Sequence, residues 1–193
     1  MGEVVYRDNA GKQGKPLLLE GAGLVYIELR PDLDFETIRG NLGIPTVVTR
    51  GVFRGLSLPV YATNNEELFG TICVPNRWDE ASNIKVHLYC WLAGAEDSKN
   101  FNLQISWKHY TNGTDVVPAT STDVAVETPT GASAAQFQSY KVEFTLVYDD
   151  LEDDDIMGLR IRRIAASANE CAGEIVVNHY GVMFRRDKLG VIA

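Results

Sequence analysis

The sequence predicts an all-β fold, an antiparallel β-sandwich of jelly-roll-like type with an extended N-terminal arm. Three observations lead to this prediction. Beyond about residue 47, several segments alternate apolar and polar residues with a period of two, which is the pattern of half-buried strands. These segments are short and are bounded by Gly, Pro, Asn or Asp, as in sandwiches and barrels. No segment of comparable length repeats its apolar residues with the period of a helix.

The length of 193 residues suits one domain with a hydrophobic core, together with an arm. Residues 1–50 are expected to form the arm or anchor region, and residues 51–193 the sandwich domain. Residues 1–23 mix Gly, Lys and Asn and show no sustained periodicity. A short strand is expected at residues 24–29, and Asp34 is suited to cap a single helical turn that ends at Ile38.

The arm carries apolar side chains that are expected to contact a neighbouring subunit. They are Val4, Val5, Tyr6, Leu17, Leu18 and Leu19. An extended segment with apolar points is suited to lie along the sheet edge of a neighbour and to add main-chain hydrogen bonds there. These six residues are therefore the predicted partner-binding positions of the arm.

The clearest strand is predicted over residues 84–92, where five apolar residues face one side of the strand and Lys85, His87, Tyr89 and Trp91 face the other. The same alternation predicts strands at residues 101–110, 140–146 and 157–162. The last long strand, 174–185, is apolar on both faces, which favours a central position or an interface. A tight turn is predicted at residues 111–114, followed by a long surface connection at 115–135 with one edge strand at 123–127.

Charge and composition exclude several classes of partner. The chain has 18 Lys and Arg against 26 Asp and Glu, a net charge of −8, and no basic stripe, so nucleic acid is not expected to bind. No apolar run approaches the roughly 18 residues of a membrane span, and no signal peptide is evident. Cys73, Cys90 and Cys171 lack C-x-x-C spacing and are expected to be free thiols in a reducing compartment, with Cys90 in the core.

Three sets of side chains invite a catalytic or metal-binding interpretation. The acidic run at residues 149–155 has six carboxylates but not the spacing of a calcium loop, so a solvated turn is the better interpretation. His87, His109 and His179 have no metal-ligand spacing and are expected to be structural. No carboxylate pair stands out among 26 acids, and no nucleophile or phosphate-binding motif is present. We therefore expect no enzyme activity, no catalytic residue, no cofactor and no metal site.

The basic and aromatic side chains suggest contacts rather than chemistry. Arg160, Arg162 and Arg163 are expected to form ion pairs, with the acidic run as the nearest partner, or a subunit contact. Trp107 shares the apolar face of its strand and is expected in the core. Trp91 lies on the polar face of its strand, so it is the better candidate for a contact surface.

Several short motifs are similar to those of virion proteins of tailed bacteriophages. They are V-P-x-x-W-D at residues 74–79, Y-C-W at 89–91, L-R-I-R-R at 159–163 and G-V-M-F-R at 181–185. The resemblance covers roughly residues 64 to 186. It implies a jelly-roll-like sandwich that decorates a capsid, and it implies no catalytic residue.

On this resemblance the chain is expected to be a capsid decoration or cement protein, made in the host cytoplasm and located in the virion. Its expected partners are the major capsid protein or other virion subunits and further copies of itself, with a trimer as the natural assembly. Two alternatives stay open. One is a tail or fibre component. The other is a carbohydrate-binding or receptor-binding sandwich, in which Trp91 and the loop at 111–135 meet the ligand.

Deletion of residues 2–23 tests the predicted arm. We expect the deletion to lower incorporation of the protein into particles, because it removes all six apolar contact residues at once. Incorporation is measured as the amount of protein that co-purifies with particles. Unchanged incorporation would reject the anchor role.

Overall fold

The computed structural model describes residues 25–29, 45–60, 66–75, 82–147 and 150–186. These residues form ten strands and contain no helix, so none of them belongs to a helix that spans a membrane. The predicted all-β class is confirmed. The strands are β1 (Val25–Leu29), β2 (Val47–Arg50), β3 (Phe53–Leu58), β4 (Glu67–Cys73), β5 (Ile84–Leu92), β6 (Asn100–Tyr110), β7 (Thr122–Pro129), β8 (Ser139–Leu146), β9 (Ile156–Ile164) and β10 (Ile175–Arg186).

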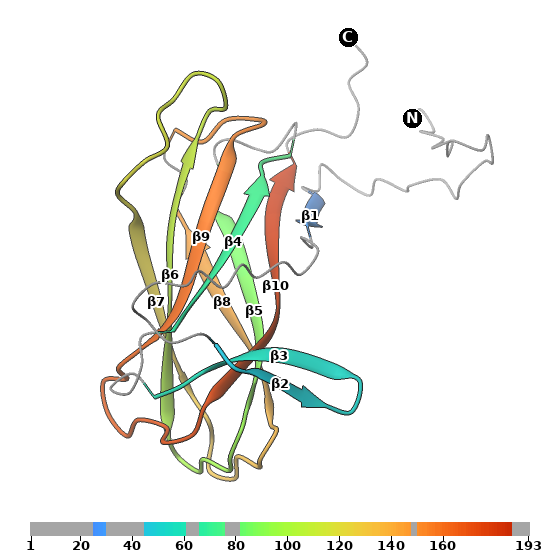
Figure 1. Ribbon diagram of the computed structural model, residues 1–193, viewed down its shortest axis with the longest axis vertical. Helices are drawn as coiled ribbons and strands as arrows, with labels where there is room; N and C mark the ends of the chain where they lie inside the picture. The colour runs from blue at the N-terminus through green and yellow to red at the C-terminus, as the bar shows by residue number, and fades with distance from the viewer. Residues whose placement is uncertain (1–24, 30–44, 61–65, 76–81, 148–149, 187–193) are drawn as a thin grey trace, which may run out of the picture.

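Two antiparallel sheets face one another in a jelly-roll-like sandwich (Figure 1). The six-stranded sheet has the order β2-β3-β10-β5-β8, and β1 also pairs with β10. The four-stranded sheet has the order β4-β9-β6-β7. One side of β10 pairs with β5, while its other side pairs with β3 near its start and with β1 near its end. This position explains why the sequence of β10 is apolar on both faces.

The strands agree with the sequence prediction to within a residue or two at most ends. Strand β5 has the predicted bounds, and β7 is the predicted edge strand, extended at both ends. Strands β1 and β2 belong to the predicted arm of residues 1–50, and both are hydrogen-bonded into the six-stranded sheet. The helical turn expected at residues 34–38 lies outside the described residues.

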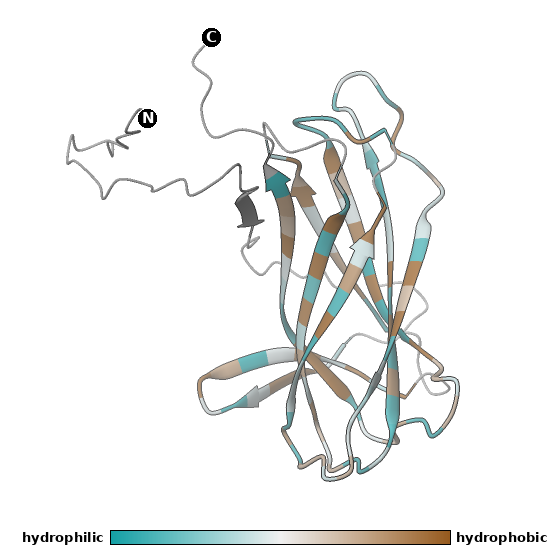
Figure 2. Cartoon of the chain, turned by 180° about the vertical axis from the view of Figure 1, so that it is seen from behind, coloured by the Kyte–Doolittle hydropathy of each residue, from teal (hydrophilic) through white to brown (hydrophobic). Residues whose placement is uncertain are grey.

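The core lies between the two sheets and is formed by alternate residues of the long strands. Figure 2 shows hydrophobic and hydrophilic residues alternating along these strands. In β5 the inward residues include Leu88, Cys90 and Leu92, and in β6 they include Ile105 and Trp107, all at most 3% exposed. Burial of each large apolar side chain stabilises the fold by about 1.5–3 kcal/mol. Cys90 and Trp107 are therefore core residues as predicted, and burial raises the pKa of the Cys90 thiol to about 12. All three cysteines are free thiols.

One contact between the layers depends on a glycine. Tyr180 of β10 is 2% exposed and reaches across the core to β4. A Cβ atom at Gly70 would lie 2.6 Å from the Oη atom of Tyr180 and 2.9 Å from its Cζ atom. Since the ring is enclosed by the core, Gly70 is the residue that gives the phenol its space.

Substitution of Gly70 by alanine tests this contact. We expect Gly70→Ala to lower the free energy of unfolding by about 1–3 kcal/mol, because the added methyl group overpacks the core against Tyr180. Gly158→Ala is the matched control, since a Cβ atom there meets only the Lys108 carbonyl oxygen, at 3.9 Å. Urea unfolding of the two variants measures the difference. Equal stability of the two would show that Tyr180 moves aside without cost.

Candidate functional site: a groove beside the β2–β3 hairpin

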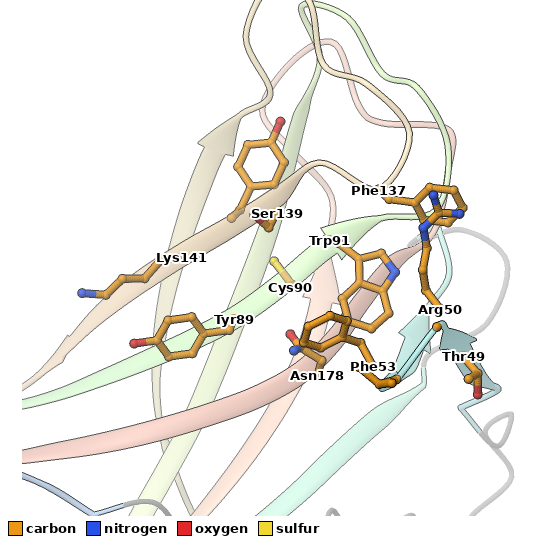
Figure 3. A pocket seen from close by; sticks show the side chains of 13 residues that line it. Thr49, Arg50, Phe53, Tyr89, Cys90, Trp91, Phe137, Ser139, Lys141 and Asn178 are labelled. Carbon is orange, nitrogen blue, oxygen red and sulfur yellow. The ribbon is translucent and has the colours of Figure 1, made fainter.

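A groove of about 1060 Å³ lies on the outer face of the six-stranded sheet, beside the hairpin formed by β2 and β3 (Figure 3). We call it the hairpin groove. Its floor comes from three neighbouring strands and its wall from the hairpin tip and from Phe137, which precedes β8. The floor side chains are Tyr89 and Trp91 of β5, Ser139 and Lys141 of β8 and Asn178 of β10.

The alternation of side-chain directions along a strand determines which residues form the floor of the hairpin groove. Cys90 points into the core, so its neighbours Tyr89 and Trp91 point outward, about 7 Å apart along the strand. Tyr89 is paired with Lys141 on one side and with His179 on the other, and its ring lies 5.5 Å from the imidazole of His179 between centroids. The two aromatic residues therefore share one face of the sheet.

An irregularity in β10 adds a polar side chain to the floor. The pairing of β10 with β5 shifts register between Val177 and His179. The extra residue at this bulge is Asn178, and it lines the groove. Bulges change the direction of a side chain without ending the strand, which explains how an amide comes to lie in the aromatic part of the groove.

The hairpin wall is positioned by two glycines. Arg50 pairs with Phe53, and the turn between them places Gly51 at φ +58°, as in a type II′ turn with glycine at its first central position. At Gly55 a Cβ atom would lie 2.8 Å from the backbone oxygen of Val177 and 3.1 Å from the Trp91 ring. Only glycine allows the hairpin base to pack this closely on the sheet.

Trp91 is on the outer face, as the sequence predicts, but it is not an open stacking platform. The hairpin covers it, and only 7% of the residue is exposed. Its indole nitrogen, Nε1, is buried and has no hydrogen-bond partner among the described residues. In Figure 3 this nitrogen faces the end of the groove where Arg50 and Phe137 lie. A buried N–H without a partner costs about 1–3 kcal/mol.

Arg50 and Phe137 form that end of the groove. The guanidinium carbon of Arg50 lies 3.4 Å from the centroid of the Phe137 ring, a cation–π contact between the hairpin and the segment before β8. Phe137 has φ +66°, an uncommon conformation for a large residue. Its backbone N–H donates to the Leu92 carbonyl oxygen at 2.9 Å, which holds the ring in this position.

The structure does not bring the other predicted ligand-contacting loop to Trp91. Among the described residues, none that lines the hairpin groove comes from the loop at 111–135. Residues 117–121 of this loop instead line a smaller groove of about 360 Å³ on the outer face of the four-stranded sheet. Trp91 and this loop therefore line two different grooves. The arm residues Val4, Val5, Tyr6, Leu17, Leu18 and Leu19 lie outside the described residues.

The histidines lie on three strands and have separate roles. Nε2 of His87 lies 2.9 Å from Oε2 of Glu143, and the pKa of this carboxyl is lowered, first by its hydrogen bond from Lys85 and then by that from His87. His109 contacts Asp155, and His179 packs on Tyr89. The described residues contain no cluster of three side chains that would hold a metal ion.

The acidic run is not simply a solvated turn. Asp155 is fully buried and accepts hydrogen bonds from the Thr111 hydroxyl at 2.8 Å and from the Glu152 backbone N–H at 3.0 Å, besides its contact with His109 Nδ1 at 2.8 Å. Asp150, Glu152 and Asp154 are exposed. The expectation of a solvated turn holds for these three and is wrong for Asp155, because this carboxylate joins the acidic turn to the end of β6.

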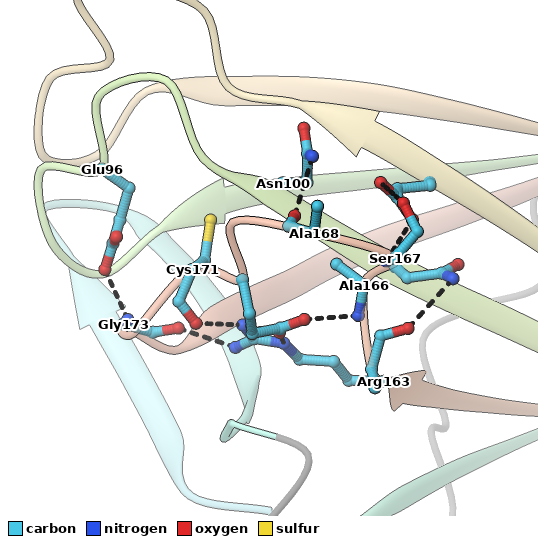
Figure 4. Close-up of polar contacts among 12 residues, drawn as sticks. Glu96, Asn100, Arg163, Ala166, Ser167, Ala168, Cys171 and Gly173 are labelled. Carbon is cyan, nitrogen blue, oxygen red and sulfur yellow. Dashed lines mark hydrogen bonds and ion pairs between the residues drawn. The ribbon is translucent and has the colours of Figure 1, made fainter.

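The arginines find other partners than the acidic run. Arg160 and Arg162 lie 3.7 and 3.9 Å from Glu67. Arg163 is 4% exposed and binds Glu170 and the carbonyl oxygens of Cys171 and Gly173, which organises the connection between β9 and β10 (Figure 4). The contacts of Arg160 and Arg162 with Glu67 follow from strand register, because β9 lies beside β4.

The comparisons with known proteins concern the fold. No family model and no curated protein matches the chain. Among solved structures, a xylan-binding module CBM15 is similar with 11% identity and a TM-score of 0.43, over 87% of this chain and 100% of that chain. CtCBM11 is similar with 11% identity and a TM-score of 0.39, over 81% of this chain and 95% of that one. A non-crystalline cellulose-specific module, CBM28, has 13% identity and a TM-score of 0.36, over 74% and 78% of the two chains.

At these identities the similarity extends to the strand arrangement and not to a ligand. The resemblance to phage virion proteins, and with it the expected capsid partners and location, stays a prediction that these comparisons leave untested.

A carboxylate pair that sequence reasoning missed lies at the start of β4 and β10. Glu66 is 9% exposed, and its pKa is raised, first by burial and then by the negative charge of Glu174. Glu174 accepts a hydrogen bond from the Ser57 hydroxyl at 2.7 Å. Neither glutamate lines the hairpin groove or the smaller groove. The pair therefore bears on stability, and no sequence spacing would have revealed it.

Replacement of Glu66 by glutamine tests the pair. Because the folded-state pKa of Glu66 is raised, its contribution to stability is present at acid pH and is lost as the pH rises through that pKa. We expect Glu66→Gln to match the parent protein at acid pH and to become more stable than it toward neutral pH. Glu152→Gln, at an exposed position, serves as the control. Urea unfolding across this pH range checks the expectation, and a difference that does not vary with pH would refute it.

Proposed function

We propose that this chain is a glycan-binding module that holds an oligosaccharide in the hairpin groove and has no catalytic role. The observation that carries the proposal is the groove on the outer sheet face, which the exposed ring of Phe53 and the half-buried ring of Tyr89 line beside polar side chains. Grooves of this kind, mostly apolar with a few convergent polar groups, are the usual binding sites of proteins for small ligands.

The chemistry of the lining suits a sugar. A pyranose ring has an apolar face of C–H groups and a rim of hydroxyl groups, so it needs aromatic surface and hydrogen-bonding side chains at the same place. Tyr89 and Phe53 supply aromatic surface, and Phe53 is 63% exposed. Ser139 and Asn178 supply donors and acceptors beside the rings.

The size of the groove favours a chain of sugars over a single one. Its volume of about 1060 Å³ is just above the usual range for ligand sites, which is roughly 300–1,000 Å³. The sheet floor and the hairpin wall are built from paired strands, so the site is formed before the ligand arrives. Because the strands that line the groove are already ordered, binding of a ligand costs less conformational entropy of the protein.

The resemblance to phage virion proteins suggests the setting for such a module. On a particle with many copies, weak binding at each groove would add up to strong adhesion, because later contacts are intramolecular. We therefore include display on a virion, as a decoration protein bound to capsid or neighbouring subunits, in the proposal. This part rests on the sequence motifs alone.

Binding to a glycan array tests the proposal. We expect the parent protein to bind, and Tyr89→Ala to lower the affinity by about fivefold or more, since aromatic anchors typically contribute above 1 kcal/mol. Tyr110→Ala, in the smaller groove, is the matched control and should bind as the parent does. Absence of glycan binding, or equal loss in the control, would sink the proposal.

A further inference from the structure

We infer that the hairpin groove selects an acidic oligosaccharide, one whose sugar residues carry carboxylates, as uronic acids do. This inference rests on the proposed function and adds the chemical class of the ligand. It follows from the charges that line the groove, from their lack of ion-pair partners and from their placement.

The lining has a charge opposite to that of the whole molecule. The chain carries a net charge of −8. Among the described residues that line the hairpin groove there is no aspartate or glutamate, whereas Arg50 and Lys141 are both present. A local field of this sign attracts anions although the protein as a whole repels them.

Neither cation is neutralised by the described part of the protein. Arg50 and Lys141 form no ion pair with any described residue. The acid nearest in sequence to Lys141 on the same strand face is Glu143, but this carboxylate is held by Lys85 at 2.7 Å and by His87 at 2.9 Å. Across the strands, Lys141 faces Tyr89 rather than an acid.

Several other cations on the sheets are paired. Lys85 binds Glu143, Arg162 lies 3.7 Å from Asp123, and Arg163 binds Glu170. The outer faces therefore supply acids at these cations, whereas the described residues supply none at Arg50 and Lys141. A ligand that carries negative charge would complete the pairing there.

The geometry of Arg50 favours a carboxylate. Its guanidinium lies over the face of the Phe137 ring, 3.4 Å from the centroid. A guanidinium held by its face keeps the N–H groups of its edge available, and a planar carboxylate meets such an edge with two parallel hydrogen bonds. Phe137 thus fixes the plane in which the acid group is expected to lie.

The two cations are separated along the groove. In Figure 3, Lys141 and Arg50 lie at opposite ends of the groove, with Tyr89 and Trp91 between them. A chain with an acid group on more than one sugar would place carboxylates at both ends and sugar faces over the aromatic residues.

Matched oligosaccharides test the inference. A panel of uronate oligosaccharides is compared with the same panel after carboxyl reduction, which converts each uronic acid to the neutral sugar and keeps every linkage. We expect the parent protein to bind a uronate member at least tenfold more tightly than its reduced form, and this preference to shrink as salt is added. Isothermal titration or array binding measures the ratio.

Variants assign the preference to the two cations. Arg50→Gln and Lys141→Gln are each expected to weaken binding of the uronate form about fivefold or more and to weaken binding of the reduced form much less, so that the ratio of the two affinities falls. Lys108→Gln, a cation of the smaller groove, is the matched control and should change neither.

The outcomes separate this inference from the proposed function. Equal or tighter binding of the reduced panel overturns the acidic ligand and leaves glycan binding standing. Binding of sulfated oligosaccharides without binding of uronates overturns the choice of carboxylate. An equal loss in Lys108→Gln shows attraction by general charge and overturns the assignment to the groove. Absence of binding to every glycan overturns both proposals.

Discussion

Strand β5 supplies side chains to the core on one face and to the candidate site on the other, and the rest of the structure depends on this arrangement. Its inward residues, among them Leu88, Cys90 and Leu92, fill the space between the sheets. Period two then leaves Tyr89 and Trp91 no other side than the outer face. Because a slip of one residue in the register would expose the core set to water, the position of these aromatic residues is as strongly determined as the core itself. The candidate site therefore takes its rigidity from the packing beneath it.

What turns an outer sheet face into a groove is the β2–β3 hairpin. Gly55 lets the hairpin base pack on Trp91 and Val177, and the Arg50–Phe137 contact ties the hairpin tip to the segment before β8. The bulge in β10 directs Asn178 into the same space. Each is a local departure from regular strand geometry, and such departures are common where a protein forms a binding site.

The surroundings of the charged side chains differ between the core, the outer sheet faces and the hairpin groove. Buried charges such as Asp155 and Arg163 are surrounded by hydrogen-bond partners, as the high cost of burying an unpaired charge requires. On the outer face of the four-stranded sheet, Arg162 of β9 pairs with Glu67 of the neighbouring strand β4 and, across β6, with Asp123 of β7. In the hairpin groove this pattern stops, and cations are left beside aromatic rings on an acidic protein.

The sequence by itself determined the fold class and most strand positions, because alternation of apolar and polar residues records a physical requirement of each strand on its own. It also determined the core placement of Cys90 and Trp107, and the outward direction of Trp91. Only the tertiary structure decided that a hairpin covers Trp91, that Asp155 is buried, that Arg162 pairs with Glu67 and Asp123, and that Arg50 and Lys141 line one groove. These facts depend on which strands become neighbours, and such contacts join residues far apart in the chain. Local periodicity tells which way a side chain points; it carries no information about what will lie against it.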